Sequence, residues 1–249
     1  MSDLLPQYSG VVSLWAQDVD IFNRWKLSSM LSYAQDVANS HCTLLGCGWN
    51  ELMADYRCCY VLTRMHLEIE KYAQSYDKVK ITTWPDNKRR ILFTRYFTFE
   101  LESGERLGSA VSEWVLMNVD TRSIVKPADC DIKYPDTSKI NAPLKMPKKI
   151  FINDDAGISF SKRPVYSDFD YNGHVNNAKY IEWVCDLFPP EHYKDNPIKT
   201  IDIRYVQEIR TNDEVTLNLI KKEDESAFFV KGTDSSEKSF FECYGQWQH

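Results

Sequence analysis

The chain is organised around residues 168–180, DFDYNGHVNNAKY, where two kinds of sequence pattern meet. Asp170, Asn172 and His174 are spaced two residues apart, which places their side chains on one side of an extended or turning backbone. The residues that follow change to helical spacing, with an apolar face of Ala178, Ile181, Val184, Cys185 and Phe188. We therefore expect a carboxylate, an amide and an imidazole where a helix begins, a place that suits a developing negative charge.

The same residues also have a purely structural interpretation. Asp, Asn and Gly are common in turns before helices, and Asn176 alone can serve as the N-cap of the helix. A single His after a turn is more often structural than catalytic. The spacing by itself leaves both interpretations open.

Composition and charge narrow the class of protein. The 249 residues are 43% hydrophobic and 27% charged, which is typical of a soluble globular protein with a sizeable core. The formal net charge of −6 argues against general nucleic-acid binding, which needs a basic face. We find no apolar run of membrane-spanning length, no signal-peptide core and no transit leader, so we expect a cytoplasmic protein without a membrane span.

The motifs of several enzyme classes are missing from the sequence. The seven Cys have no zinc-type spacing and the five His form no His-Glu-x-x-His motif, so we expect reduced thiols and no metal site. The chain also lacks a Gly-x-Ser-x-Gly motif, a phosphate loop and a dinucleotide fingerprint. Serine-hydrolase and nucleotide-cofactor chemistry are therefore unsupported.

The first half predicts one long helix followed by antiparallel strands. A strand over 8–15 and a turn over 18–23 precede a helix that begins near Ser28 and is stopped by Gly46. Its apolar face comprises Leu27, Met30, Leu31, Ala34, Val37, Ala38, His41, Leu44 and Leu45. Strands are expected over 60–70, 79–83, 93–101 and 107–119. His41 lies on the buried face, so we expect a core or cavity-lining imidazole.

The second half predicts the same order of elements. Residues 123–161 contain four Pro and no lasting periodicity, which indicates a connecting segment. A strand over 158–166, the turn, a helix to about Phe188 and strands over 201–205, 215–219, 227–231 and 240–247 follow. We predict an N-terminal domain over 1–128, a linker over 129–154 and a C-terminal domain over 155–249.

The two halves align with each other at two offsets. Asp20 precedes the first helix as Asp170 precedes the second (170 − 20 = 150), and Asp77 opens a strand as Asp213 does (213 − 77 = 136). At the first offset, Asn172 corresponds to Phe22 and His174 to Arg24. We therefore expect a duplicated domain with one chemical centre, in the second copy.

The central motif closely resembles a known family signature. Asp-x-Asn-x-His-Val-Asn-Asn-x-Lys-Tyr-Ile, followed by Trp183, resembles the signature of the acyl-acyl carrier protein thioesterases of the hotdog superfamily, here of a bacterial type without a transit peptide. Further matching fragments are Gly46-Cys47-Gly48-Trp49, Ile81-Thr82-Thr83-Trp84, and 112–118 with Thr121-Arg122. The resemblance implies an α+β fold of two tandem hotdog domains, each a long helix wrapped by an antiparallel β-sheet.

The resemblance also implies the catalytic residues. The family's Asp, Asn and His fall on Asp170, Asn172 and His174, and a Glu in a later Tyr-x-x-Glu-Cys segment falls on Glu208. The Cys of that segment is Ile209 here, which excludes a cysteine nucleophile at this position. Cys185, on the apolar helix face, is expected in the core. Asp170 and Glu208 are then the candidates for activating water, and which of them is the base stays open.

Asn172 and His174 are expected to position the water or the thioester. The backbone N–H groups near Gly173, Val175 and Asn176 are expected to contact the substrate and polarise its carbonyl. Gly173 also leaves room for a substrate to approach the backbone.

The implied activity is hydrolysis of fatty acyl-acyl carrier protein to a free fatty acid and the carrier thiol, with no cofactor because water suffices. In the family the first half commonly determines chain length, which makes Met30, Val37, Trp49 and the strand over 93–99 candidate lining residues. The acidic carrier needs a local basic patch, for which Lys88-Arg89-Arg90 and 145–149 are candidates. The protein is expected to be a monomer or a homodimer.

Three rival functions remain. An acyl-coenzyme A thioesterase would use the same site, a hotdog dehydratase or hydratase would use one carboxylate and one His, and an acyl-binding sensor would have no chemistry. Asn172 and Glu208 favour hydrolysis over dehydration, and a sensor usually carries a DNA-binding helix pair for which this chain has no spare basic segment.

Overall fold

A computed structural model describes residues 4–86, 91–126, 129–149, 157–222 and 224–248. The chain forms two compact units, one of Met1–Thr63 and Glu70–Met146, the other of Arg64–Ile69 and Pro147–His249. The boundaries that we predicted at 128 and 155 stay a prediction. No helix among the described residues is long and apolar enough to cross a membrane.

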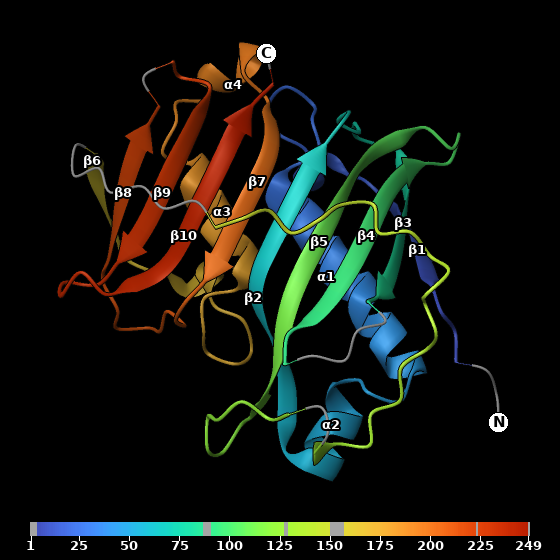
Figure 1. Cartoon of the computed structure of the whole chain (residues 1–249). Coiled ribbons are helices and arrows are strands. Elements are labelled where there is room, and N and C mark those ends of the chain that lie inside the picture. The colour runs from blue at the N-terminus through green and yellow to red at the C-terminus, as the bar shows by residue number, and fades with distance from the viewer. Residues whose placement is uncertain (1–3, 87–90, 127–128, 150–156, 223, 249) are drawn as a thin grey trace. The chain divides into compact units, whose positions relative to one another are not determined.

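The first unit is an antiparallel sheet with one long helix. Its strands are ordered β1-β3-β4-β5-β2, and the helix α1 contacts β1 and β3. Figure 1 shows α1 in blue, lying across the face of β4 and β5. The elements are β1 (Tyr8–Ser13), η1 (Ala16–Asp18), α1 (Leu27–Leu44), α2 (Trp49–Tyr56), β2 (Cys58–Ile69, whose last six residues belong to the second unit), β3 (Lys78–Pro85), β4 (Phe93–Leu101) and β5 (Arg106–Asn118).

Helix α1 confirms most of the predicted apolar face. The predicted residues are buried except Leu44, which is 61% exposed at the last position of the helix, so that part of the prediction is wrong. Gly46, with φ +72°, ends the helix as expected, because a left-handed residue there suits glycine. Helix α2 was not predicted; it ends at Arg57, which adopts φ +54° without being a glycine.

The second unit repeats the plan with a shorter helix. Its strands are ordered β7-β10-β9-β8-β6, and residues Arg64–Glu68 of β2 pair with β7. Tyr180 on α3 packs edge-on against Tyr205 of β7 and Phe241 of β10. The elements are β6 (Ile158–Lys162), η3 (Tyr166–Asp168), α3 (Asn177–Cys185), α4 (His192–Asp195), β7 (Ile198–Tyr205), β8 (Val215–Lys221), β9 (Ala227–Thr233) and β10 (Ser239–Trp247).

Three predictions for the second unit need correction. The strand predicted over 158–166 ends at Lys162 because Tyr166–Asp168 form a 3-10 turn. Helix α3 ends at Cys185, three residues before Phe188, and has nine residues rather than the length of α1. Cys185 is only half-buried, so it is not the core residue that we expected.

Hydrogen bonds confirm the duplication pair by pair. In the first unit the Asp18 carboxylate accepts from the backbone N of Trp15 (2.8 Å), and the backbone carbonyl of Asp18 accepts from the N of Lys26 (2.8 Å). In the second unit, 150 residues later, the Asp168 carboxylate accepts from the N of Val165 (2.8 Å), and the backbone carbonyl of Asp168 accepts from the N of Asn176 (2.9 Å). Both helices therefore begin from the same turn, at Leu27 and at Asn177.

Replacing Asp168 tests how much this turn contributes to the stability of the fold. Asp168 is 5% exposed and also accepts from Trp183 Nε1 (3.3 Å), so Asp168→Ala leaves the buried indole N–H of Trp183 and the partly buried N–H of Val165 without their acceptor. We expect the free energy of unfolding in urea to fall by about 2–3 kcal/mol. Glu214→Ala, at an exposed carboxylate of the same unit, is the control and should change it by less than about 0.5 kcal/mol. Equal effects of the two substitutions would contradict the assignment.

Candidate active site

The central motif folds into a tight turn. The backbone N of Asp170 donates to the carbonyl of His174 (3.0 Å), and the N of Gly173 donates to the carbonyl of Asp170 (3.0 Å). Gly173 has φ +75°, a conformation that favours glycine, and Phe169 and Val175 face each other as an antiparallel bridge. Asp170 and His174 are thus paired through their backbones, while Asn172 is exposed near the tip of the turn.

The Asp170 carboxylate has a structural task as well. Its Oδ1 accepts from the backbone N of Asn172 at 2.8 Å, which stabilises the turn. The first unit contains the same bond, from the N of Phe22 to Asp20 Oδ1, also at 2.8 Å. Because the first unit keeps the Asp without the amide and imidazole, an aspartate here is explained by the turn alone.

The structure brings His174 together with Glu208. His174 Nε2 lies 3.1 Å from Glu208 Oε2, and about a quarter of each side chain is exposed. Arg210 Nη2 lies 3.6 Å from the same carboxylate oxygen. The Glu208 carboxylate therefore lies between an imidazole and a guanidinium. The pair is open enough to meet solvent, which a water-activating group requires.

Backbone contacts hold these two segments side by side. The N of Val175 donates to the carbonyl of Ile209 (2.9 Å), and His174 and Arg210 face each other as an antiparallel bridge. The backbone N of Ile209 in turn donates to the hydroxyl oxygen of Tyr180 on α3 (3.2 Å). Ile209 itself is fully buried, so the position at which the family carries Cys is here part of the core.

Tyr180 is a site residue that we had not assigned. Burial raises the pKa of its hydroxyl, and the nearby carboxylates of Glu208 and Asp170 raise it further. The phenol of Tyr180 therefore stays protonated at neutral pH. A signal existed in the sequence, because Tyr180 lies on α3 two residues after Ala178 in the quoted motif, but nothing local indicated its partner Ile209.

The expected carbonyl-polarising amides are already occupied. The N–H groups of Gly173, Val175 and Asn176 donate to the carbonyls of Asp170, Ile209 and Asp168, respectively. The turn uses these three donors for its own hydrogen bonds, and the prediction that N–H groups within 173–176 polarise the carbonyl stays a prediction. Val175 is buried in the core, and Asn176 is the N-cap of α3, its Oδ1 accepting from the N of Ala178 (2.9 Å). Their contact with substrate stays a prediction.

The first unit has the same scaffold with different side chains. The N of Trp25 donates to the carbonyl of Ala73 (2.9 Å), as Val175 does to Ile209. At the two offsets, Phe22, Arg24 and Tyr72 occupy the positions of Asn172, His174 and Glu208. The Arg24 guanidinium lies over the Phe22 ring, 5.3 Å from its centroid. The amide, imidazole and second carboxylate thus occur in the second unit alone.

Among the described residues, no group of three or more His, Cys, Asp or Glu is placed to hold a metal ion.

The two segments that we predicted as a basic patch differ in what the structure describes. Lys88, Arg89 and Arg90 lie outside the described residues. Lys149 pairs with Glu242 at 3.1 Å, which partly neutralises the patch over 145–149.

Comparison with known families accounts for nearly the whole chain. Residues 8–132 match the N-terminal domain of acyl-ACP thioesterases, and residues 153–248 match their C-terminal domain. The crystal structure of an acyl-ACP thioesterase from Bacteroides thetaiotaomicron is 25% identical, with a TM-score of 0.89 and full coverage of both chains. The 12:0-ACP thioesterase from Umbellularia californica has the same fold, with a TM-score of 0.85 at 20% identity over 98% of each chain.

Plant enzymes are among the relatives by sequence. Oleoyl-acyl carrier protein thioesterase 2 of Arabidopsis thaliana is 29% identical over 89% of this chain, and the oleoyl thioesterase of Coriandrum sativum is 30% identical over 86%. This chain spans 65% and 62% of the length of these two relatives. The predicted α+β fold of two tandem hotdog domains is confirmed by these matches.

Removing one hydroxyl tests the role of Tyr180. Tyr180→Phe leaves the buried N–H of Ile209 without its acceptor, so we expect a loss of about 1–3 kcal/mol in the free energy of unfolding. Tyr244→Phe is the matched control, because its hydroxyl accepts only a long bond (3.3 Å) from Gln246 at an exposed position. Urea titrations of both variants are the measurement, and a stable Tyr180→Phe protein would show that the bond has no structural weight.

Proposed function

Because the chain belongs to the acyl-ACP thioesterase family, we propose that it hydrolyses fatty acyl-acyl carrier protein to a free fatty acid and the carrier thiol. The observation that carries the proposal is the contact of His174 Nε2 with Glu208 Oε2 at 3.1 Å. This contact lies beside the turn that contains Asp170. At the equivalent positions the first unit has neither a His nor a Glu, so it cannot form the same pair.

In the proposed reaction the His174–Glu208 pair activates water. A thioester carbonyl is electrophilic enough for a water whose proton is held by a base at hydrogen-bond distance. The water oxygen bonds to the carbonyl carbon, its proton passes to the pair, and the carbon–sulfur bond then breaks. The proton finally goes to the leaving thiolate, which restores the pair and releases the acid.

Asp170 and Asn172 take positioning roles in this scheme. One oxygen of the Asp170 carboxylate is engaged by the turn, which leaves the other free to orient water or His174. The Asn172 side chain is exposed at the tip of the same turn, where its amide can donate to the thioester oxygen. With the backbone amides of 173, 175 and 176 occupied, this side-chain amide is the donor that we assign to the oxyanion.

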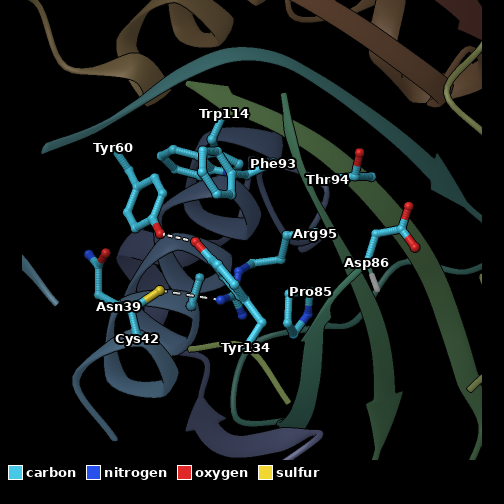
Figure 2. Close-up of a pocket in the computed structure, with 11 residues that line it drawn as sticks. Asn39, Cys42, Tyr60, Pro85, Asp86, Phe93, Thr94, Arg95, Trp114 and Tyr134 are labelled. Carbon is cyan, nitrogen blue, oxygen red and sulfur yellow. Dashed lines mark hydrogen bonds between the residues drawn. The ribbon is translucent and has the colours of Figure 1, made fainter. Parts of the chain in front are cut away.

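The acyl chain is assigned to the first unit. Its described residues include a pocket with Phe93 and Trp114 on the lining, and Phe93 is on the strand that we predicted as part of the cavity (Figure 2). Met30 and Val37 are buried in the core instead, and Trp49 is 44% exposed. The preferred chain length is therefore a matter for substrate profiling.

Single substitutions test the catalytic assignment. We expect Glu208→Gln, His174→Ala and Asp170→Asn each to lower kcat on an acyl-carrier substrate by about 100-fold or more, because each removes a group that handles the proton or the water. Thiol release, followed with a chromogenic reagent, is the measurement, and unfolding curves establish that each variant is folded.

The duplication supplies a matched control for the aspartate. Asp20→Asn removes the same turn-stabilising carboxylate in the first unit, where the amide and imidazole are replaced by Phe22 and Arg24. Because an Asn oxygen can still accept the hydrogen bond of the turn, both variants should stay folded, and Asp20→Asn should keep most of the activity. Full activity in folded Asp170→Asn, or an equal loss in Asp20→Asn, would reduce Asp170 to a turn residue.

Carrier choice separates the main alternative. An acyl-coenzyme A thioesterase would use the same residues, so kcat/KM on the two carriers with one acyl chain decides between them. Charge reversal of Lys88, Arg89 and Arg90 to Glu should weaken activity on the acidic protein carrier by about 10-fold or more while sparing the coenzyme A ester. Equal losses on both substrates would place carrier docking elsewhere. Absence of any thiol release would favour the acyl-binding sensor.

A further inference from the structure

The end of α1 places two cysteines against each other. Gly46, with φ +72°, donates its N–H to the carbonyl of Thr43 (3.0 Å), and Cys47 donates its N–H to the carbonyl of Cys42 (2.9 Å). These two hydrogen bonds form the common motif in which a helix ends at a glycine. In this motif the side chains of the two residues that the outer bond joins, here Cys42 and Cys47, commonly lie close together. The side chains at these positions are the thiols of Cys42 and Cys47, and each thiol shifts the pKa of the other.

A buried guanidinium meets this pair from the sheet. Arg95 of β4 is 7% exposed, and its Nη2 donates to Cys42 Sγ at 3.2 Å. Figure 2 shows the two side chains pointing toward each other at the pocket of the first unit. No carboxylate among the described residues forms an ion pair with Arg95. A charge buried in this way needs an anion close by.

The other groups around Arg95 do not supply that anion. Its Nη1 donates to His41 Nδ1 (3.1 Å) and to Thr83 Oγ1 (3.3 Å). His41 Nε2 donates to the carbonyl of Leu5 (2.9 Å), so this imidazole is neutral; burial above all, and then the Arg95 charge, lower its pKa to about 4. Burial raises the pKa values of both Tyr60 and Tyr134, which bond to each other through their hydroxyls.

The thiol of Cys42 can supply the anion. The Cys47 thiol and the charge of Arg95 lower the pKa of Cys42, while the pKa of Cys47 is raised by its neighbour and by burial. Burial raises the pKa values of Cys58, Cys130 and Cys243 as well. Cys42 is the thiol that accepts from the buried guanidinium of Arg95, and it lies on the lining of a pocket.

We propose that Cys42 and Cys47 form a thiol-oxidation site, in which Cys42 reacts with a small hydroperoxide that enters the pocket and Cys47 resolves the product as a disulfide. The proposal stands on the Cys42–Arg95 contact, the Cys42–Cys47 contact and the opening to the pocket. It does not rest on the proposed hydrolysis, whose catalytic residues are assigned to the other unit, although the pocket is the one to which we assign the acyl chain.

The chemistry of the site balances with hydrogen peroxide, the simplest such hydroperoxide, as the oxidant. The Cys42 thiolate attacks one peroxide oxygen, the oxygen–oxygen bond breaks, and hydroxide leaves and takes a proton to become water. The sulfur of Cys47 then attacks the Cys42 sulfenic acid, so that the sulfur–sulfur bond forms and a second water leaves with the Cys47 proton. Two thiols are oxidised by two electrons in total, and one peroxide is reduced to two waters.

Alkylation of the reduced, full-length protein with iodoacetamide tests the nucleophile. Peptide mapping by mass spectrometry should find Cys42 modified first, with a rate that reaches half its maximum well below the about 8.5 of an ordinary thiol. The titratable and charged groups that face Cys42 across the pH range are His41, Cys47, Tyr60, Asp86, Arg95 and Tyr134. A half-maximum near 8.5, or a reaction at Cys42 no faster than at half-buried Cys185, would overturn the proposal.

Peroxide treatment tests the resolving step. Equimolar hydrogen peroxide should yield a disulfide between Cys42 and Cys47 in the unaltered protein and in the control Cys185→Ser. In Cys47→Ser the sulfenic acid should persist at Cys42 and be captured by dimedone, and in Cys42→Ser neither product should form. Both serine variants avoid the risk of unfolding that replacing buried Arg95 carries. A disulfide to any other Cys, or dimedone capture elsewhere in Cys47→Ser, would contradict the pairing.

Discussion

One backbone hydrogen bond, from the N of Val175 to the carbonyl of Ile209 at 2.9 Å, holds together the two segments on which the candidate site depends. The residues beside it are His174 and Glu208, whose side chains are 3.1 Å apart although they are far apart in the chain. Tyr180 reinforces the arrangement by accepting from the N of Ile209. The position of the acid relative to the imidazole is thus set by main-chain geometry, which side-chain substitution does not easily disturb.

The duplicated fold separates scaffold from chemistry. Asp18 and Asp168 stabilise equivalent turns, and Trp25 and Val175 make equivalent bonds to Ala73 and Ile209. At this turn the two units differ in the side chains that it presents. The turn that positions a helix start is therefore common to both units, whereas the amide, the imidazole and the glutamate occur at these positions in the second unit alone. The turn alone accounts for Asp170, but it does not account for His174 or Glu208.

The first unit, free of that chemistry, carries a different electrostatic feature. Arg95 is buried against neutral His41 and the Cys42 thiol, in a pocket that also has aromatic lining. A cation in a low-dielectric setting favours whichever neighbouring acid ionises most easily. Among the neighbours it is Cys42, because burial disfavours ionisation of the tyrosines.

The sequence by itself determined the order of the elements, the apolar face of α1, the turn at 168–176 and the duplication, because these follow from spacing within a few residues. It also placed Asp170, Asn172 and His174 together, whereas Glu208 came from the family resemblance. The end of α3 at Cys185, the existence of α2 and the exposure of Leu44 depend on packing that local periodicity does not encode.

Only the tertiary structure decided which partners meet: His174 with Glu208, Tyr180 with Ile209 and Cys42 with Arg95. It also decided that the amides of Gly173, Val175 and Asn176 are occupied. The reason is that such contacts join segments through strand order and register, which arise from the burial of the whole core and not from any single segment.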